Sequence, residues 1–275
     1  MLVTLKEILN IAEERQIAVG SFNTPNMTSI KAVIGAAEEF GQPVIIMHAQ
    51  VHEEMGLCKM EEIAPVMLMF AERANVPVCV HLDHGTDLEY VKNGLRLGFT
   101  SVMYDGSVLS AEENTANTLI AVEVAKQTGA SVEAEIGSMG AREGGEGSDT
   151  SIYTDPAAAV KFVADTGIDA LACAFGTAHG FYKDKPKLDF ERLSKIHSLI
   201  DVPIVMHGGS GVSEEDYREV IRRGVRKVNY YTYMAKAGGD AISNKTYSQF
   251  HDALLDAERA MRDNVKKAIS VFSEL

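Results

Sequence analysis

The sequence predicts an α/β fold, a single (β/α)8 TIM barrel with extra C-terminal helices. Eight short runs rich in apolar and β-branched residues alternate with longer segments of helical periodicity along the 275-residue chain. The main alternative is a doubly wound open sheet, which usually carries a Gly-rich phosphate turn after its first strand. The SFNTPN segment at the end of the first expected strand has no GxGxxG pattern, so the barrel is favoured. No linker-like segment divides the chain, and we expect residues 1–275 to form one domain.

Gly, Pro or Asp bounds most of the expected strands, as these residues end strands and open turns. In chain order the strands are residues 18–23, 43–48, 77–83, 101–106, 131–137, 170–176, 203–209 and 227–232. Helical periodicity occupies residues 26–40, 60–74, 110–128, 155–166, 189–199 and 213–223. These spacings suit right-handed crossovers between parallel strands.

The two ends of the chain are predicted to be helical. Charged residues interrupt the apolar ones in residues 1–16, which indicates an amphipathic helix and not a signal peptide. Residues 234–272 contain no Pro and no further strand pattern, so we expect them to cap or flank the barrel. The Gly- and Ser-rich segment 138–151 is expected to be a long loop of the kind that is functional or disordered.

Composition excludes several classes of protein. The 26 Lys and Arg against 39 Asp and Glu give a net charge of −13, which argues against general nucleic-acid binding and against docking on an anionic membrane. A hydrophobic content of 46% excludes a disordered chain. No apolar run approaches the ~18 residues of a membrane span. The three cysteines share no CxxC spacing, so we expect no disulfide framework and a cytoplasmic location.

Polar side chains follow almost every expected strand. In a TIM barrel the carboxyl ends of the strands and the loops after them form the active-site face. Any one of these residues alone is more simply read as a hydrogen-bonded structural residue, but their gathering at one end predicts a site. The residues are Asn23, Asp83, His84, Asp105, Glu135, His179, His207 and Asn229.

Three of these side chains are imidazoles from different strands. His84, His179 and His207 form the ligand set that suits Zn²⁺ with one position left open for a substrate. His81 lies on the same strand face as Asp83 but deeper, and is expected to be structural. His48 lies at the end of the second strand, and the pattern does not decide whether it reaches the rim of the pocket. The other histidines, which are expected to be solvated, are His52, His197 and His251.

Two segments suggest a phosphate site. HGGSG at residues 207–211 leads into a helix that begins near Ser213, and small residues let backbone N–H groups approach an anion. Residues 229–232 end the eighth strand, and barrel phosphate sites are usually built after strands seven and eight.

With these residues placed, the chain resembles the class II, metal-dependent ketose-bisphosphate aldolases. The similarity covers residues 1–232 and includes GSFN, PVCVHLDHG, SVMYDGS, VEAEIG, AFGTAHGFY, PIVMHGGSG and KVN in matching order. The resemblance implies a TIM barrel that cleaves fructose or tagatose 1,6-bisphosphate, or a related ketose 1-phosphate, to dihydroxyacetone phosphate and an aldehyde. It also implies a homodimer or homotetramer.

The resemblance further implies roles for individual residues. Asp83 matches the catalytic acid that exchanges a proton with the aldehyde oxygen, and Glu143 matches the glutamate that moves the C3 proton in some members. His84, His179 and His207 match the Zn²⁺ ligands, and Asp105 and Glu135 match carboxylates that hold a second or displaced cation. The residues that match the substrate pocket are Asn23, Gly180, Lys183, Gly208, Gly209, Ser210, Asn229 and Thr232.

The implied reaction is chemically coherent. Cleavage of the C3–C4 bond leaves an enediolate on the ketone half, and a cation at the C2 oxygen stabilises that charge. A Schiff-base lysine is not required, and no strand-borne lysine stands out at the predicted mouth. Two alternatives stay open: a metal-dependent sugar-phosphate epimerase, which would release no aldehyde, and a non-catalytic barrel that binds a metabolite.

The chain also departs from the family pattern. Tyr230, Tyr231 and Tyr233 make the rim after the eighth strand bulkier and replace an acid there. In the long loop Gly144 stands where the family has a second acid, and His48 lies close to where a Ser or Thr often contacts the far phosphate. The tail lacks the Asp-Pro-Arg segment whose Arg often reaches that phosphate. We therefore expect the ketone-phosphate half of the site to be retained better than recognition of a second phosphate.

Overall fold

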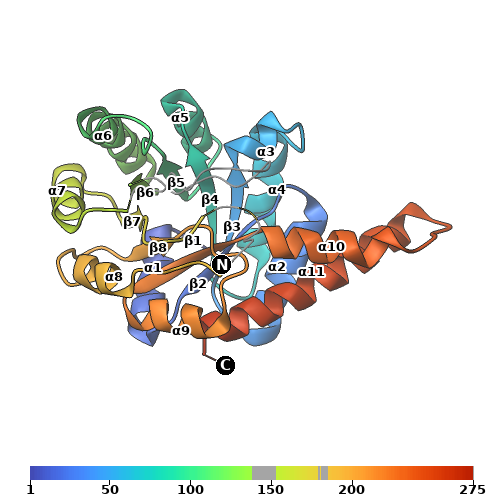
Figure 1. Cartoon of the computed structure of the whole chain (residues 1–275). Coiled ribbons are helices and arrows are strands. Elements are labelled where there is room, and N and C mark those ends of the chain that lie inside the picture. The colour runs from blue at the N-terminus through green and yellow to red at the C-terminus, as the bar shows by residue number, and fades with distance from the viewer. Residues whose placement is uncertain (138–152, 179, 181–184, 275) are drawn as a thin grey trace.

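The predicted strands form a closed parallel barrel in the computed structural model, which describes residues 1–137, 153–178, 180 and 185–274 (Figure 1). Each strand pairs with the next one in the chain, and β9 pairs with β2 to close the ring. The predicted fold class is thus confirmed. The barrel strands are β2 (Val19–Asn23), β3 (Val44–Ala49), β4 (Val78–Gly85), β5 (Ser101–Tyr104), β6 (Ser131–Ile136), β7 (Ala170–Cys173), β8 (Ile204–Met206) and β9 (Val225–Tyr230).

Helices cover the outside of the barrel. Several begin at a side chain that accepts a hydrogen bond from the first helical turn, such as Asn26, Ser110 and Asp155. Three elements were not expected from the sequence: β1 (Leu2–Val3), which pairs with β4, the short α3 (Gln50–Glu54) and α5 (Leu88–Arg96). The remaining outer helices are α2 (Met27–Phe40), α4 (Met60–Arg73), α6 (Ala111–Thr128), α7 (Pro156–Thr166), α8 (Phe190–His197) and α9 (Glu214–Arg222).

Alternation along the strands separates two apolar clusters. Ile45 and Met47 of β3 share a cluster with α1 (Leu5–Arg15), whereas Val44 and Ile46 of the same strand pack against the outer helices. The apolar face of α1 therefore closes the amino end of the barrel, and the site is built at the opposite end.

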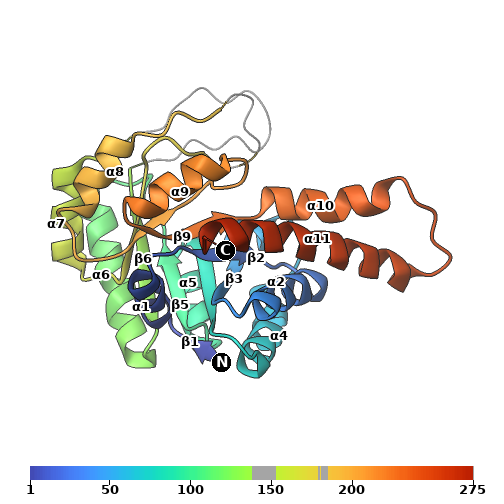
Figure 2. The same cartoon turned by 90° about the horizontal axis from the view of Figure 1, so that it is seen from below.

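The C-terminal helices form an arm that projects from the barrel (Figures 1 and 2). α10 (Thr232–Ser243) leaves the mouth of the barrel, and α11 (Phe250–Phe272) returns along it to pack on α2. The tail is helical as predicted, except for a turn over residues 244–249. Within the described part of the chain, no helix has the length and apolarity needed to cross a bilayer.

Candidate active site

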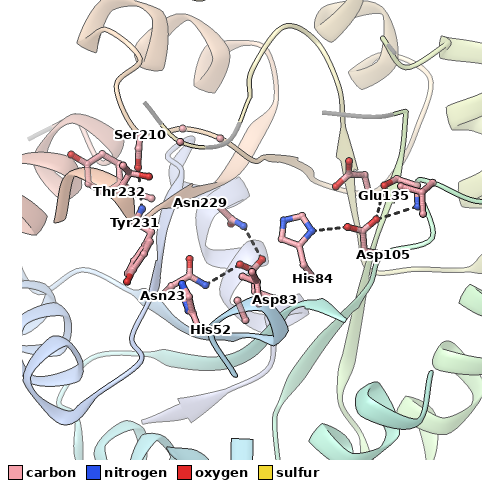
Figure 3. A pocket seen from close by; sticks show the side chains of 18 residues that line it. Asn23, His52, Asp83, His84, Asp105, Glu135, Ser210, Asn229, Tyr231 and Thr232 are labelled. Atoms are coloured by element: carbon pink, nitrogen blue, oxygen red, sulfur yellow. Dashed lines mark hydrogen bonds and ion pairs between the residues drawn. The ribbon is translucent and has the colours of Figure 1, made fainter. Parts of the chain in front are cut away.

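A pocket of about 310 Å³ opens at the carboxyl end of the barrel (Figure 3). Its wall combines side chains from strands that are far apart in the sequence. The structure therefore brings together most of the residues that the sequence placed at the strand ends. The predicted residues that line the pocket are Asn23, Asp83, His84, Asp105, Glu135, Gly180, Gly208, Gly209, Ser210, Asn229 and Thr232.

His84 reaches the pocket because its backbone departs from the strand conformation. Asp83 already points into the barrel, so simple alternation would turn His84 toward the outer helices. Its φ is +47°, and the β4–β5 register shifts between Leu82 and Gly85. The imidazole consequently lies in the pocket wall, with Nδ1 2.7 Å from Oδ2 of Asp105. Because a carboxylate only accepts, Nδ1 carries the proton and Nε2 faces away from Asp105.

His207 completes a pair with His84 just below the pocket. Its Nδ1 lies 2.8 Å from Nε2 of His84, and its own Nε2 lies 2.7 Å from Oε1 of the buried Glu133. In both rings a carboxylate holds one nitrogen and the other nitrogen points to a shared position. Bonds of this kind orient ligand imidazoles in metal sites.

The donor set at this position fits a divalent cation. Asp83, His84 and His207 offer ligand atoms that all lie within 4.8 Å of one another, and His84, Asp105 and Glu135 form a second, overlapping group. Two convergent imidazoles with adjacent carboxylates match the ligands that zinc prefers. The third predicted imidazole, His179, lies outside the described residues.

Charges in the site shift the pKa values of Asp83 and His84, two adjacent residues of β4. Burial would lower the pKa of His84, but the carboxylates of Asp83 and Asp105 outweigh it and raise that pKa to about 10. Burial would raise the pKa of Asp83, but His84, His207 and Lys227 hold it well below its usual range. Two amides also hold the Asp83 carboxylate, because Nδ2 of Asn23 and of Asn229 donate to it at 2.9 and 3.1 Å.

The expected phosphate segment forms a tight turn beside the pocket. Gly208 has φ +62°, and a Cβ there would lie 2.4 Å from the carbonyl oxygen of Ala178. The Ser210 hydroxyl accepts a hydrogen bond at 3.0 Å from the backbone N–H of Tyr231, which directly precedes α10. The first turn of α10 has no acidic residue, unlike that of α9, so its amino end is the one suited to an anion.

The structure also settles where the less certain histidines lie. His48 points outward from β3, with Nε2 2.9 Å from the Tyr90 hydroxyl, and is not part of the pocket wall. His81 is buried and bonded to Ser101, as expected. The prediction of a solvated His52 was wrong: α3 bends over the mouth and buries this ring against Tyr231, with the centroids 4.7 Å apart. Of the other two, His197 is half-buried and His251 is exposed.

Two residues next to the site were missed. Glu133 and Lys227 are fully buried one layer below the pocket, and their side chains form an ion pair at 2.9 Å. Each lies two residues before a predicted site residue, Glu135 or Asn229, so period-two alternation could have found them. The predicted Glu143 and Lys183 lie outside the described residues.

Comparisons with known proteins find the same family along nearly the whole chain. A family model described as fructose-bisphosphate aldolase class-II matches residues 3–274. A fructose-bisphosphate aldolase of Staphylococcus aureus (strain Mu50 / ATCC 700699) is 37% identical over 98% of this chain and 97% of its own. A probable fructose-bisphosphate aldolase of Bacillus subtilis (strain 168) is 40% identical over 84% of this chain and 81% of its own.

Solved structures show the same similarity. The YdjI aldolase from Escherichia coli K12 superposes with a TM-score of 0.90 at 33% identity, covering 99% of this chain and 97% of that one. A putative fructose-1,6-biphosphate aldolase from Coccidioides immitis also gives a TM-score of 0.90, at 29% identity, with 98% and 95% covered.

Proposed function

Since the chain belongs to the class II fructose-bisphosphate aldolase family and is therefore a lyase, we propose that it is a zinc-dependent aldolase acting on a phosphorylated ketose. The products are dihydroxyacetone phosphate and an aldehyde. The observation that carries this proposal is the convergence of His84 and His207 on one position beside the clamped carboxylate of Asp83.

Zinc would be held by Nε2 of His84, Nδ1 of His207 and, by family resemblance, His179. When bound, it supplies a Lewis acid that polarises the ketone and stabilises the negative charge left by C3–C4 cleavage. Asp105 is already bonded to His84 and orients that ring, and Glu135 lies with it where a second cation would bind.

Asp83 is proposed to take the proton from the C4 hydroxyl as the C3–C4 bond breaks, so that C4 leaves as an aldehyde. In the synthetic direction it returns that proton to the aldehyde oxygen. The amides of Asn23 and Asn229 fix the carboxylate for this role, because each donates to a different oxygen. Glu143 is proposed to exchange the proton at C3.

Two variants separate the cation site from the proton-transfer residue. We expect His84→Ala to lose both bound zinc and aldehyde release, and Asp83→Ala to keep zinc and lose most turnover. Zinc content by elemental analysis and a coupled assay for a glyceraldehyde-type product measure the two effects. An active, zinc-free His84→Ala protein would falsify the cation assignment, and an epimer formed without aldehyde would favour the epimerase.

The substrate is proposed to be a ketose 1-phosphate in preference to a bisphosphate. The amino end of α10, whose first turn carries no acidic residue and which lies beside the turn at Gly208, offers one place for a phosphate. Among the described residues that line the pocket, none is Lys or Arg to hold a second one. Comparison of kcat/KM for fructose 1,6-bisphosphate, tagatose 1,6-bisphosphate and ketose 1-phosphates tests this, and a clear preference for a bisphosphate rejects it.

We also propose a homodimer or homotetramer in the cytoplasm. Apolar residues are exposed near the tip of the arm, where the Phe250 side chain is 79% exposed and Leu254 and Leu255 follow it on α11. Such a patch on a projecting element suits contact with another subunit. The three cysteines form no disulfide in the structure, an arrangement that suits a reducing compartment.

A further inference from the structure

A buried ion pair lies directly beneath the pocket. Lys227 of β9 and Glu133 of β6 have no solvent-exposed surface, and Nζ is 2.9 Å from Oε2. The interior of a TIM barrel is ordinarily filled by branched apolar side chains. A buried ion pair is costly to desolvate, and apolar residues of similar volume are often as stable or more so. Stability alone therefore does not account for this pair.

One end of the pair reaches the cation site. Glu133 Oε1 lies 2.7 Å from Nε2 of His207. Because the carboxylate only accepts, Nε2 must carry the proton, and the lone pair of His207 is left on Nδ1. Nδ1 is the nitrogen that points to His84 Nε2, the position proposed for zinc.

The other end of the pair reaches the proton-transfer residue. Lys227 Nζ donates to Oδ1 of Asn229 at 2.7 Å. An amide can be placed either way round, but an ammonium group has no lone pair to accept with. Lys227 therefore keeps the oxygen of Asn229 turned toward itself, and the amide N–H₂ faces Oδ1 of Asp83 at 3.1 Å.

We infer that Lys227 and Glu133 are positioning residues that together orient His207 toward the cation and Asn229 toward Asp83. This inference rests on the proposed function, because it assigns the two contacts to the cation and proton-transfer halves of that site. Neither residue touches the pocket, so each acts through its neighbour.

Two double variants separate this role from a structural one. Glu133→Leu with Lys227→Met replaces the pair by apolar side chains, so that neither charge of the pair is left without its partner. Glu133→Gln with Lys227→Met also removes both charges of the pair, but the Gln amide oxygen can still accept from His207. Both remove the donor that fixes Asn229. Thermal unfolding, Co²⁺ affinity with the visible Co²⁺ spectrum, and kcat and KM are measured on each.

The matched control is the neighbouring buried cation of the same strand. Arg226 points away from the barrel interior and pairs with Glu13 of α1. We expect Arg226→Met with Glu13→Gln to lower the unfolding temperature and to leave Co²⁺ binding and kcat unchanged.

The expected results differ between the two double variants. The Glu133→Leu, Lys227→Met protein (the Leu/Met protein) should fold and should bind Co²⁺ about 10- to 100-fold more weakly, with an altered spectrum. Its kcat should also fall. The Gln/Met protein should recover most Co²⁺ affinity while its kcat stays about 10- to 100-fold low at little-changed KM. Wild-type Co²⁺ affinity and kcat in the Leu/Met protein would overturn the inference.

A failure of the proposed function gives a different result. Wild-type protein that binds Co²⁺ but releases no aldehyde from any phosphorylated ketose would reject the aldolase substrate assignment. The Co²⁺ affinities of the two double variants would still differ if Glu133 orients His207. Equal affinities there would overturn the inference by themselves.

Discussion

His84 illustrates how one residue's backbone can decide what a site is able to bind. A left-handed φ is uncommon for a residue other than Gly and costs free energy of the order of 1–3 kcal/mol. In this chain His84 Nδ1 donates to Asp105, and His84 Nε2 lies 2.8 Å from Nδ1 of His207; these two contacts hold the ring in that conformation. This backbone conformation turns the His84 ring into the pocket, whereas a residue with ordinary strand φ would have pointed out of the barrel.

The buried His48 predicts a pH dependence of stability. Burial lowers its pKa from 6.5 to about 4, against the opposing effect of Glu53. The unfolded chain therefore binds a proton at this position below about pH 6.5, whereas the folded protein does so only near pH 4. The free energy of unfolding should fall as the pH drops through this window, by about 1.4 kcal/mol per pH unit at most.

Urea unfolding of wild type and His48→Gln between pH 7 and pH 5 measures this slope. The variant should lose part of this slope and not all of it, because burial also lowers the pKa of His81, to about 3, and that ring still contributes. Identical slopes in the two proteins would show that His48 is not the titrating group.

Strand-end residues could be predicted because alternation and chain order are both visible in the sequence. Asp83 and Asn229 needed only the assumption of a barrel to be placed at one mouth. The inward turn of His84 and the burial of His52 depend on a local φ and on a helix that begins one residue after β3 ends. The Glu133–Lys227 pair joins strands that are adjacent neither in sequence nor in the sheet, so its contact needed the closed barrel.

At the scale of elements, the turn after β8 predicts a specific effect of one methyl group. Gly208→Ala adds a Cβ at φ +62° that meets the Ala178 carbonyl oxygen, so the loops after β7 and β8 must separate. We expect a higher KM for the phosphorylated ketose and weaker inhibition by inorganic phosphate, in addition to a loss of stability.

Gly41→Ala is the matched control for this substitution. Gly41 ends α2 at φ +60°, and a Cβ there would have no neighbour within 4 Å. Both variants should lose roughly 1–2 kcal/mol of stability from the left-handed conformation, but Gly41→Ala should keep the wild-type KM. If KM changes in neither variant, or equally in both, the turn at Gly208 is not part of the phosphate site.

The elements that sequence analysis missed are short or polar. β1 has two residues, and its strand character depends on the pairing of Leu2 with Val78. α5 was overlooked because it is only nine residues long and mostly polar, with Val91, Gly94 and Leu95 as its buried residues. The long helices α2 and α6 were predicted to within a residue at each end, since both begin at a side-chain cap and end at a glycine.

Across the whole molecule, charge and architecture together restrict how an anionic substrate is held. The chain carries a net charge of −13, and carboxylates line one side of the pocket. A phosphate is therefore best placed away from Asp105 and Glu135, at the turn and helix end on the other side (Figure 3). Backbone N–H groups supply attraction there without adding a flexible cation, and α1 keeps the opposite end of the barrel closed.

The arm carries the surface through which we propose that subunits associate. Lys245 and Tyr247 both bond to Asp256 at 2.7 and 2.9 Å, so the tip is ordered by contacts within the arm itself. The apolar surface of Phe250 and Leu254 is then available to another subunit. We expect Phe250→Asp with Leu254→Asp to shift the protein to a smaller species in size-exclusion chromatography with light scattering. The fold should persist, because the buried residues of α11 lie from Met261 onward.

Leu199→Asp is the control, because Leu199 is 45% exposed, similar to Leu254 at 38%. It follows α8, which lies on the side of the barrel opposite the arm (Figure 1). The substitution introduces one of the two chemical changes, Leu to Asp, without touching the proposed contact, and its molar mass should match that of wild type. A wild-type mass for the arm variant, or a monomeric wild type at micromolar concentration, would show that the arm does not join subunits. Equal losses of mass in both variants would point to general destabilisation, which far-UV circular dichroism would reveal.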